Sequence, residues 1–299
     1  MIDSFQELFK NLKTKREVRI VVAGGEDLES LKALKACYNL GFGEAILVGD
    51  KKEIEKSISL VGEDCFIQDI IEAENEADKA RKAVEKAKEG GTLLKGKIKT
   101  ANLLKAVLNK EWGLRTNSII SDVFVFEDRR ENIPRLVLMS DGGVNIRPDV
   151  NTLISIINNA VVVAHKLGKE KPKVALLAAV ETINPDMEET IKAGMIAKMN
   201  QRGQITGCII DGPLALDNAV SEYAAQRKGI VSPVAGQADI LIVPDIASGN
   251  IFGKALTYYA KLPVGHILVG TRVPVIIPSR ADDSETKLNC IALSILCSM

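Results

Sequence analysis

Two short segments of the sequence carry residue types that bind anions and stabilise negative charge. Ser279 and Arg280 follow an apolar run. A guanidinium forks onto phosphate, and a serine hydroxyl can donate to a developing oxyanion. The segment 243–254 (VPDIASGNIFGK) places a Gly-Asn pair ahead of a lysine. Glycine lets the backbone approach a ligand closely, and the free N–H groups of a helix start attract anions. Both segments therefore predict contact with phosphate or a similar oxyanion.

Each segment also has a purely structural interpretation. Taken alone, 243–254 is explained equally well as a capped helix after a turn. The acidic residues that follow Arg280 are typical of a helix N-terminus, whose dipole favours negative charge, although one of them could act as a general base. Both interpretations are open at this point. The candidates are Asp245, Ser248, Gly249, Asn250 and Lys254 in the first segment, and Ser279, Arg280, Asp283 and Glu285 in the second.

Three further loops follow expected strands, and each alone is more often a turn than a site. The first, 95–105, is rich in lysine and contains Thr100, which could cap a helix. The second is 140–145 (SDGGVN), and the third is Asp211-Gly212-Pro213. Because α/β folds bind ligands at the carboxyl ends of their strands, we expect some of these loops to converge. Their candidate residues are Lys95, Thr100, Lys105, Asn145 and Asp211.

Strands and helices must position these loops. Short apolar, β-branched runs alternate with helical patterns along nearly the whole chain, beginning with VRIVVAG and the helix after it. This rhythm predicts an α/β fold with a parallel sheet covered on both faces. The expected strands are 18–24, 45–49, 65–70, a short one from 92, 119–126, 135–139, 173–180, 207–211, 240–243, 265–269 and 273–278, and the expected helices are 27–40, 72–91, one starting at Asp149 or Asn151, 187–200, 217–228, 249–261 and 282–297.

Composition and missing motifs argue against several classes of function. Lys plus Arg and Asp plus Glu both total 39, which leaves no electrostatic footprint for nucleic acid or an acidic membrane. We see no signal peptide and no apolar run of about 18 residues, so a cytoplasmic location is expected. The 5 cysteines lack ligand spacing and only 2 histidines are present, so no metal site is expected. Dinucleotide, P-loop and nucleophile-elbow motifs are also missing.

Several spaced motifs occur in an order that is similar to one known family. Residues 234–256 (VAGQADILIVPDIASGNIFGKAL) strongly resemble the phosphate acetyl/butyryltransferases, and so do 210–217 (IDGPLALD) and the Pro-Ser-Arg at 278–280. Lys95-Gly96, Thr100-Ala101 and GLRT at 113–116 look like the butyryl branch rather than the acetyl branch. The resemblance covers nearly the whole chain and is strongest from residue 173 onward.

The resemblance implies two α/β/α lobes with a cleft between them, similar to the isocitrate and isopropylmalate dehydrogenase architecture. Residues 1–134 and 273–299 would form the first lobe, and 135–272 the second. The implied reaction converts acyl-CoA and orthophosphate reversibly into acyl phosphate and CoA, without a covalent enzyme intermediate. CoA is then a substrate, and no permanently bound cofactor is expected. Small molecules are the expected partners, together with further copies of the chain in a homodimer or larger homo-oligomer.

The resemblance also assigns roles to individual residues. Arg280 would bind phosphate and stabilise the carbonyl oxygen in the transition state, with Ser279 assisting. Asn250 and the region of Gly249 would contact the phosphoryl group. Lys105 stands where the acetyl branch has an arginine. Where that branch has an aspartate proposed to deprotonate the CoA thiol, this chain has threonine, so the general base is open between Asp283 and Glu285.

A short-chain phosphate acyltransferase, with butyryl as the first choice of acyl group, is therefore the expected function. The same chemistry on acetyl or a branched acyl group is the nearest alternative. A metal-dependent decarboxylating dehydrogenase on the same architecture is less favoured, because its carboxylate cluster and nucleotide site are not visible. A non-enzymatic binding protein is the third option. The sequence leaves acyl-chain length, oligomer size and the physiological direction open.

Overall fold

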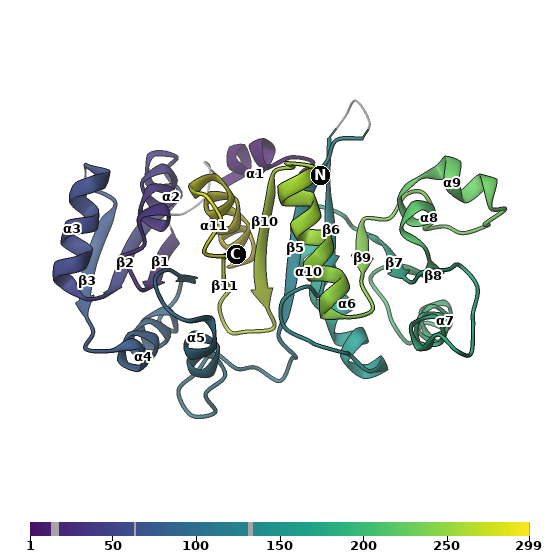
Figure 1. Ribbon diagram of the computed structural model, residues 1–299, viewed down its shortest axis with the longest axis horizontal. Helices are drawn as coiled ribbons and strands as arrows, with labels where there is room; N and C mark the ends of the chain where they lie inside the picture. The colour runs from purple at the N-terminus through teal and green to yellow at the C-terminus, as the bar shows by residue number, and fades with distance from the viewer. Residues whose placement is uncertain (13–17, 63, 131–133, 299) are drawn as a thin grey trace. The chain divides into compact units, whose positions relative to one another are not determined.

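The computed structural model describes residues 1–12, 18–62, 64–130 and 134–298 (Figure 1). The chain divides into two compact units. The terminal unit consists of Phe5–Ser118 and Val264–Met299, and the central unit of Met1–Ser4 and Ile119–Pro263. Each unit has its own run of paired strands with helices packed on them, so the expected α/β class is confirmed.

The terminal unit contains a six-stranded, mainly parallel run in the order β3-β2-β1-β4-β11-β10. Only the β10–β11 pair in this run is antiparallel. Its strands are β1 (Val18–Ala23), β2 (Gly43–Gly49), β3 (Ile67–Glu72), β4 (Thr92–Lys95), β10 (Val264–Val269) and β11 (Val275–Ile276). Its helices are α1 (Phe5–Leu12), α2 (Leu28–Asn39), α3 (Lys51–Val61), α4 (Glu76–Ala87), α5 (Thr100–Val107) and α11 (Ser284–Ser298).

Burial on both faces explains the composition of these strands. The last four residues of β1 are fully buried, as a parallel strand covered on both faces requires. Helix α2 packs on α3 and α11, whereas α4 packs on α5. The chain leaves β1 toward β2 and β3 and then returns past β1 to β4. Strand order therefore reverses between β1 and β4, which is where open α/β sheets form a ligand crevice.

The central unit contains the order β5-β6-β9-β7-β8. β5 and β6 are antiparallel, and the remaining pairs are parallel. Its strands are β5 (Ser121–Asp128), β6 (Arg135–Ser140), β7 (Lys173–Leu177), β8 (Ile209–Leu214) and β9 (Ile240–Ile242). Its helices are α6 (Val150–Lys166), α7 (Glu188–Gln201), α8 (Leu216–Val220), α9 (Glu222–Arg227) and α10 (Ile246–Lys254), which continues into the π-helical turn η1 (Ala255–Tyr259).

The helix expected over 72–91 is shorter, Glu76–Ala87, and three other expected boundaries are wrong because of capping. The helix expected over 217–228 is broken at Ser221, whose hydroxyl caps α9 by accepting the N–H of Ala224 at 3.3 Å. Thr100 is the first residue of α5 rather than its cap, and Lys99 stands before it without a side-chain hydrogen bond. The helix expected from Gly249 begins earlier, at Ile246. In each case a neighbouring residue competes for the cap, and single-residue propensity does not decide between them.

The boundaries between the two compact units differ from the lobe boundaries expected from the sequence. β5 pairs with β6 from Phe124 opposite Met139 to Asp128 opposite Arg135, and both strands belong to the central unit. β10 pairs with β11 at Leu268 and Val275 and belongs to the terminal unit. The division at 134 and 273 and the cleft between lobes stay predictions.

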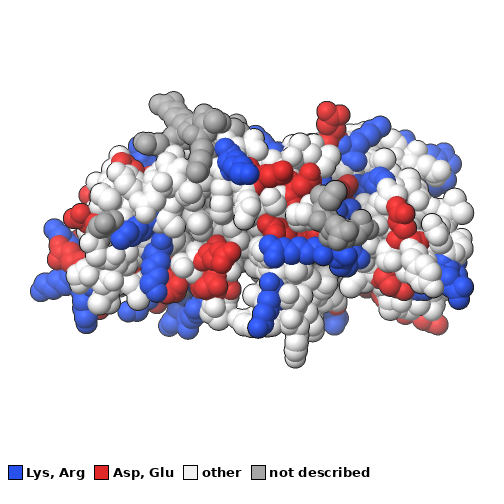
Figure 2. Space-filling model, turned by 90° about the horizontal axis from the view of Figure 1, so that it is seen from above, with Lys and Arg blue, Asp and Glu red and all other residues white. Residues whose placement is uncertain are grey.

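In the described parts of the chain, no helix combines the length and apolar character that crossing a bilayer requires. Basic and acidic side chains are interspersed over the face seen in Figure 2. This distribution agrees with the equal totals of 39 basic and 39 acidic residues.

Candidate active site

The terminal unit gathers charged residues where strand order reverses. Lys95 is the last residue of β4 and pairs in parallel with Ala23 at the end of β1. β11 pairs in parallel with β4 on the other side, and Ser279 follows it. Asp27 follows β1 as the N-cap of α2. Because parallel strands end at one edge of a sheet, these three loops share that edge.

Two glycines hold the loops after β1 and β4 against each other. A Cβ on Gly24 would lie 2.6 Å from the backbone of Lys97, and Gly24 has a positive φ of +89°. A Cβ on Gly96 would lie 2.1 Å from the carbonyl oxygen of Gly24. No side chain fits at either position, so this close backbone approach requires Gly24 and the glycine of the Lys95-Gly96 pair.

Lys95 is buried, with 4% of its surface exposed. Its Nζ donates to the carbonyl oxygen of Pro278 at 3.3 Å, which links the end of β4 to the Ser-Arg segment. Burial lowers the pKa of Lys95, and the positive charges of Lys287 and Arg280 lower it further, while nearby carboxylates such as Asp27 oppose the change. The structure thus brings Lys95 and Arg280, both predicted site residues, into one electrostatic cluster.

Lys287 belongs to the same cluster and was missed by the sequence reasoning. It lies in the first turns of α11 with 3% of its surface exposed. Its ammonium group donates to Asp27 Oδ2 and lies 3.4 Å from Ser30 Oγ. Burial would raise the pKa of Asp27, but the hydrogen bonds from Lys287 and Ser30 outweigh it and the pKa is lowered. A lysine at the start of a mostly apolar run (KLNCIALSIL) is the sequence feature that could have identified it.

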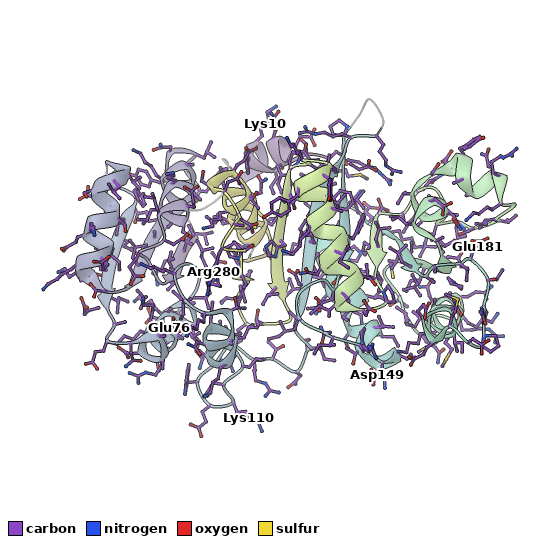
Figure 3. All side chains as sticks on the ribbon, in the orientation of Figure 1. Lys10, Glu76, Lys110, Asp149, Glu181 and Arg280 are labelled. Atoms are coloured by element: carbon purple, nitrogen blue, oxygen red, sulfur yellow. The ribbon has the colours of Figure 1, made fainter. Side chains whose placement is uncertain are left out.

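Ser279 and Arg280 lie in a tight turn between β11 and α11, and Arg280 is labelled in Figure 3. The N–H of Ser279 donates to Asp282 Oδ2 at 2.8 Å, and the N–H of Asp282 donates back to the Ser279 carbonyl at 3.2 Å. Both Ser279 and Arg280 are exposed. No described residue hydrogen bonds with the guanidinium of Arg280, which leaves all its donors for a ligand.

The two candidate bases have different surroundings. Asp283 accepts the N–H of Thr286 at 2.8 Å and therefore caps α11. This is the structural role that the sequence left open for these acids. Glu285 is exposed in the first turn of the same helix. Of the two, only Glu285 is not engaged by a backbone N–H.

In the central unit, the loop after β6 is organised by Asp141. This carboxylate is 3% exposed and accepts the backbone N–H groups of Gly143, Val144 and Asn145 at 2.8, 3.0 and 3.1 Å. It also accepts the Asn145 side-chain amide, which in addition donates to Ile120 at 2.9 Å. Burial raises the pKa of Asp141 despite these hydrogen bonds. The side-chain N–H donors of Asn145 are thus taken by Asp141 and Ile120, and its amide oxygen is the group left for a ligand.

Gly249 is required by packing. A Cβ there would lie 2.7 Å from Gly142 Cα, and a Cβ on Gly142 would lie 2.9 Å from the carbonyl carbon of Gly249. The loop after β6 and the first turn of α10 are therefore in backbone contact. Asn250 follows, exposed, with its Nδ2 3.4 Å from the Gly142 carbonyl oxygen. This contact places the loop that carries Asn145 against Gly249 and Asn250.

The helix that we expected to start at Gly249 starts at Ile246 instead. Asp245 is the N-cap of α10, and its Oδ1 accepts both the N–H and the hydroxyl of Ser248 at 2.8 Å. The backbone N–H of Ser248 is the largest cause of the lowered pKa of Asp245. The carboxylate thus already occupies a place where we expected free N–H groups to attract an anion. The N–H of Ser248 is therefore taken, and a phosphate near α10 would need other donors.

The remaining candidates differ in their surroundings. Asp211 is half-buried and accepts the N–H of Gly212 at 2.9 Å, as in a local turn. Lys254 is exposed at the end of α10, and Thr100 is exposed at the start of α5. Nothing in the described residues joins these three to the clusters above by a hydrogen bond.

Lys105 lines a cavity in the terminal unit. This pocket has a volume of about 640 Å³ and lies between α4 and α5 in the terminal unit. The single tryptophan of the chain, Trp112, lines it together with amides and cations. The lining residues are Glu74, Asn75, Ala77, Asp78, Ala80, Arg81, Lys82, Asn102, Lys105, Ala106, Asn109 and Trp112.

Another cavity, of about 210 Å³, lies in the central unit at the ends of β7 and β9. Apolar residues such as Leu153 and Leu176 line it together with charged residues, one of which is Asp245. In the described ranges, no cluster of three or more His, Cys, Asp or Glu side chains is arranged to hold a metal ion. That the protein uses no metal stays a prediction.

Comparison with known proteins identifies the family. The model of the phosphate acetyl/butaryl transferases matches residues 4–96 and 74–295. The phosphate butyryltransferase of Clostridium acetobutylicum is 46% identical over 298 residues, covering 99% of this chain and 98% of that enzyme. The phosphate acetyltransferase of Thermotoga maritima is 43% identical, covering 92% of this chain and 94% of that enzyme. A solved branched-chain phosphotransacylase from Enterococcus faecalis matches with a TM-score of 0.82 and 32% identity, over 94% of this chain and 99% of that one. The chain therefore belongs to the phosphate acetyl/butaryl transferase family.

Proposed function

We propose that this protein transfers a short-chain acyl group reversibly between CoA and orthophosphate. The observation that carries the proposal is the exposed Arg280, free of partners among the described residues and backed by the buried lysines 95 and 287. Such a cluster fits a substrate and a transition state that are both anionic. Membership of the family supports the same reaction class.

In the proposed reaction, the CoA thiolate attacks the carbonyl carbon of the acyl phosphate. The C–S bond forms, the bond from carbon to the phosphate oxygen breaks, and orthophosphate leaves. Negative charge builds on the carbonyl oxygen between these events, and Arg280 with the hydroxyl of Ser279 stabilises it. Loss of one such donor typically costs about 3–4 kcal/mol of barrier. The reverse reaction uses phosphate as the nucleophile on the thioester.

Glu285 is the stronger candidate for the base that takes the thiol proton, because Asp283 is engaged as the cap of α11. A carboxylate beside the sulfur raises the thiolate fraction of a thiol whose pKa lies above neutrality. Asp283 stays the second candidate. Exchanging each for its amide, and comparing kcat, separates them.

The pocket beside Lys105 suits the nucleotide end of CoA. An indole face stacks on a purine ring, and amide groups such as that of Asn102 hydrogen bond to its edge. Lys105 and the nearby Arg81 supply positive charge for phosphate groups. CoA is then a substrate that binds and dissociates in each turnover, and no permanently bound cofactor is proposed.

In the central unit, Asn250 and the backbone near Gly249 would contact the phosphoryl group. An amide donates to a phosphate oxygen without adding charge, and exposed Lys254 adds a cation. Asp245 already caps the helix, so it orients Ser248 rather than binding the anion. Asn145 and Asp211 stay proposed lining residues, and Thr100 a proposed contact of CoA.

Butyryl is the first choice of acyl group. The supporting observation is 46% identity to a butyryltransferase over nearly the full length, against 43% for an acetyltransferase over 92% of the chain. A branched acyl group is an alternative because of the solved branched-chain relative. A decarboxylating dehydrogenase is the least favoured. Cytoplasmic location and homo-oligomeric assembly stay predictions.

One assay tests the proposal. CoA release from butyryl-, isobutyryl- and acetyl-CoA is followed with and without phosphate, and arsenate is added in a parallel series. We expect release only when phosphate or arsenate is present, because the anion is the acyl acceptor. CoA release without either anion indicates a thioesterase and contradicts the proposal. The order of the three kcat/KM values decides the acyl group.

A further inference from the structure

We infer that Asp282 and His266 are positioning residues, which hold the turn that presents Arg280 to the substrate. The inference rests on the proposed function, since it assumes that Arg280 carries charge in the transition state. No described residue holds the Arg280 side chain, which is exposed. Its backbone is therefore the part that the fold can preorganise, and preorganisation of a charged donor is what lowers the barrier.

Asp282 closes this turn with two hydrogen bonds. Its Oδ2 accepts the N–H of Ser279 at 2.8 Å, and its own N–H donates to the Ser279 carbonyl at 3.2 Å. These two residues flank Arg280, so the bonds fix the direction in which Arg280 leaves the backbone. Without the carboxylate, the first of the two bonds is lost and the turn can open.

His266 in turn anchors the carboxylate to the sheet. Its Nε2 lies 3.8 Å from Asp282 Oδ2, which is an ion pair when the imidazole is protonated, and the Asp282 side chain is 12% exposed. The backbone N–H of His266 donates to Cys290 Sγ at 3.2 Å, which ties β10 to α11 at the same place. Burial would raise the pKa of Asp282, but His266, the N–H of Ser279 and the charge of Lys287 outweigh it. The carboxylate is therefore ionised when it accepts the bond.

Capping of α11 does not explain the place of Asp282. Its neighbour Asp283 already accepts the N–H of Thr286 at 2.8 Å. The two adjacent acids thus have separate tasks: one begins the helix, and the other closes the turn before it. A side chain that only stabilised the helix would not need to face His266 and Ser279.

The test compares Asp282→Ala, Asp282→Asn and His266→Gln in the full-length enzyme. We expect kcat to fall at least about tenfold in Asp282→Ala and about threefold to tenfold in His266→Gln, because a small misplacement of a catalytic group is costly. KM for CoA should stay within about twofold, since neither residue contacts CoA in this proposal. Asp282→Asn should recover part of the lost kcat, because its amide oxygen still accepts the N–H of Ser279.

Matched controls use residues of the same type elsewhere. Asp69→Asn alters an exposed acid on β3, and His165→Gln alters the other histidine, at the end of α6. Both should keep the kcat of the parent enzyme. Melting temperatures of all variants separate loss of fold from loss of positioning.

Arg280→Ala provides the decisive background. If Asp282 acts through Arg280, adding Asp282→Ala to Arg280→Ala should cause no further loss of kcat. A kcat within twofold of the parent in Asp282→Ala, or the same tenfold loss persisting without Arg280, overturns the inference. Full activity of Arg280→Ala itself instead overturns the catalytic role of Arg280 in the proposed function, so the two failures are distinguishable.

Discussion

Lys287 and Asp27 lie 260 residues apart in the sequence and form a hydrogen-bonded ion pair that joins α11 to the N-cap of α2. The lysine side chain is 4% exposed and the aspartate 29%. Neither charge is fully solvated, so each charged group is stabilised by the opposite charge of its partner. The pair also places the charge of Lys287 close enough to Lys95 to lower its pKa, as the charge of Arg280 does too.

Removing the lysine of this pair should destabilise the protein. In Lys287→Met, the half-buried Asp27 loses its counter-charge, and we expect a loss of about 1–3 kcal/mol of unfolding free energy at neutral pH. Urea unfolding measures it. Lys56→Met, an exposed lysine on α3, is the control and should stay within about 0.5 kcal/mol of the parent. Equal stability of both variants would show that the pair contributes nothing.

The same pair predicts a pH dependence. The pKa of Asp27 is lowered in the folded protein, so its stabilisation is present above the unfolded pKa of about 3.9 and is lost as pH falls through the folded value. Lys287→Met should raise the folded pKa toward the unfolded one and flatten this acid limb. The free energy of unfolding from pH 6 downward, measured for both proteins, checks the sign. An unchanged acid limb in the variant contradicts the assignment.

Arg280→Ala should lower kcat by about two or more orders of magnitude while leaving the fold intact. The Arg280 side chain is exposed and hydrogen bonds with no described residue, so the melting temperature should barely change. Arg280→Lys keeps the charge but loses the forked donor geometry, and we expect only partial recovery. Steady-state kinetics with acyl-CoA and phosphate measure both effects. Near-normal turnover in the alanine variant would remove Arg280 from the mechanism.

Gly249→Ala should destabilise the central unit by about 1–3 kcal/mol, because its Cβ would lie 2.7 Å from Gly142 Cα. Gly253 in the same helix is the matched control. A Cβ there meets its nearest neighbour, Met139, at 3.5 Å, which is ordinary contact. Gly253→Ala should therefore be neutral or stabilise by up to about 1 kcal/mol through helix propensity. Thermal unfolding of the two variants compares them, and equal effects would contradict the packing argument.

The single tryptophan offers a direct report on CoA binding. If Trp112 stacks on the nucleotide, its fluorescence should change on adding CoA or adenosine 3′,5′-bisphosphate. Trp112→Ala should raise KM for CoA about threefold to tenfold and leave KM for phosphate unchanged, because phosphate binds elsewhere. No fluorescence change at saturating CoA would place the nucleotide outside this pocket.

Local sequence determined much of this protein. Alternating apolar runs were sufficient to predict the α/β class and most strands, because burial on both faces of a parallel strand dictates its composition. Position at strand ends pointed to Lys95 and to Ser279-Arg280, and the structure finds Lys95 bonded to Pro278 beside them. The sequence also pointed to the Gly249-Asn250 pair, but it did not show that packing against Gly142 requires the glycine.

Tertiary structure alone decided which distant residues meet. Sheet order brings the ends of β1, β4 and β11 to one edge and so pairs Asp27 with Lys287, a contact that no local pattern encodes. Which side chain caps a helix likewise depends on its position in the fold, and Asp245 caps α10 ahead of the start expected at Gly249. Gly249 is a glycine because Gly142 lies against it. Local propensity fixes where elements form, whereas the charges and atoms that face each other depend on how those elements pack.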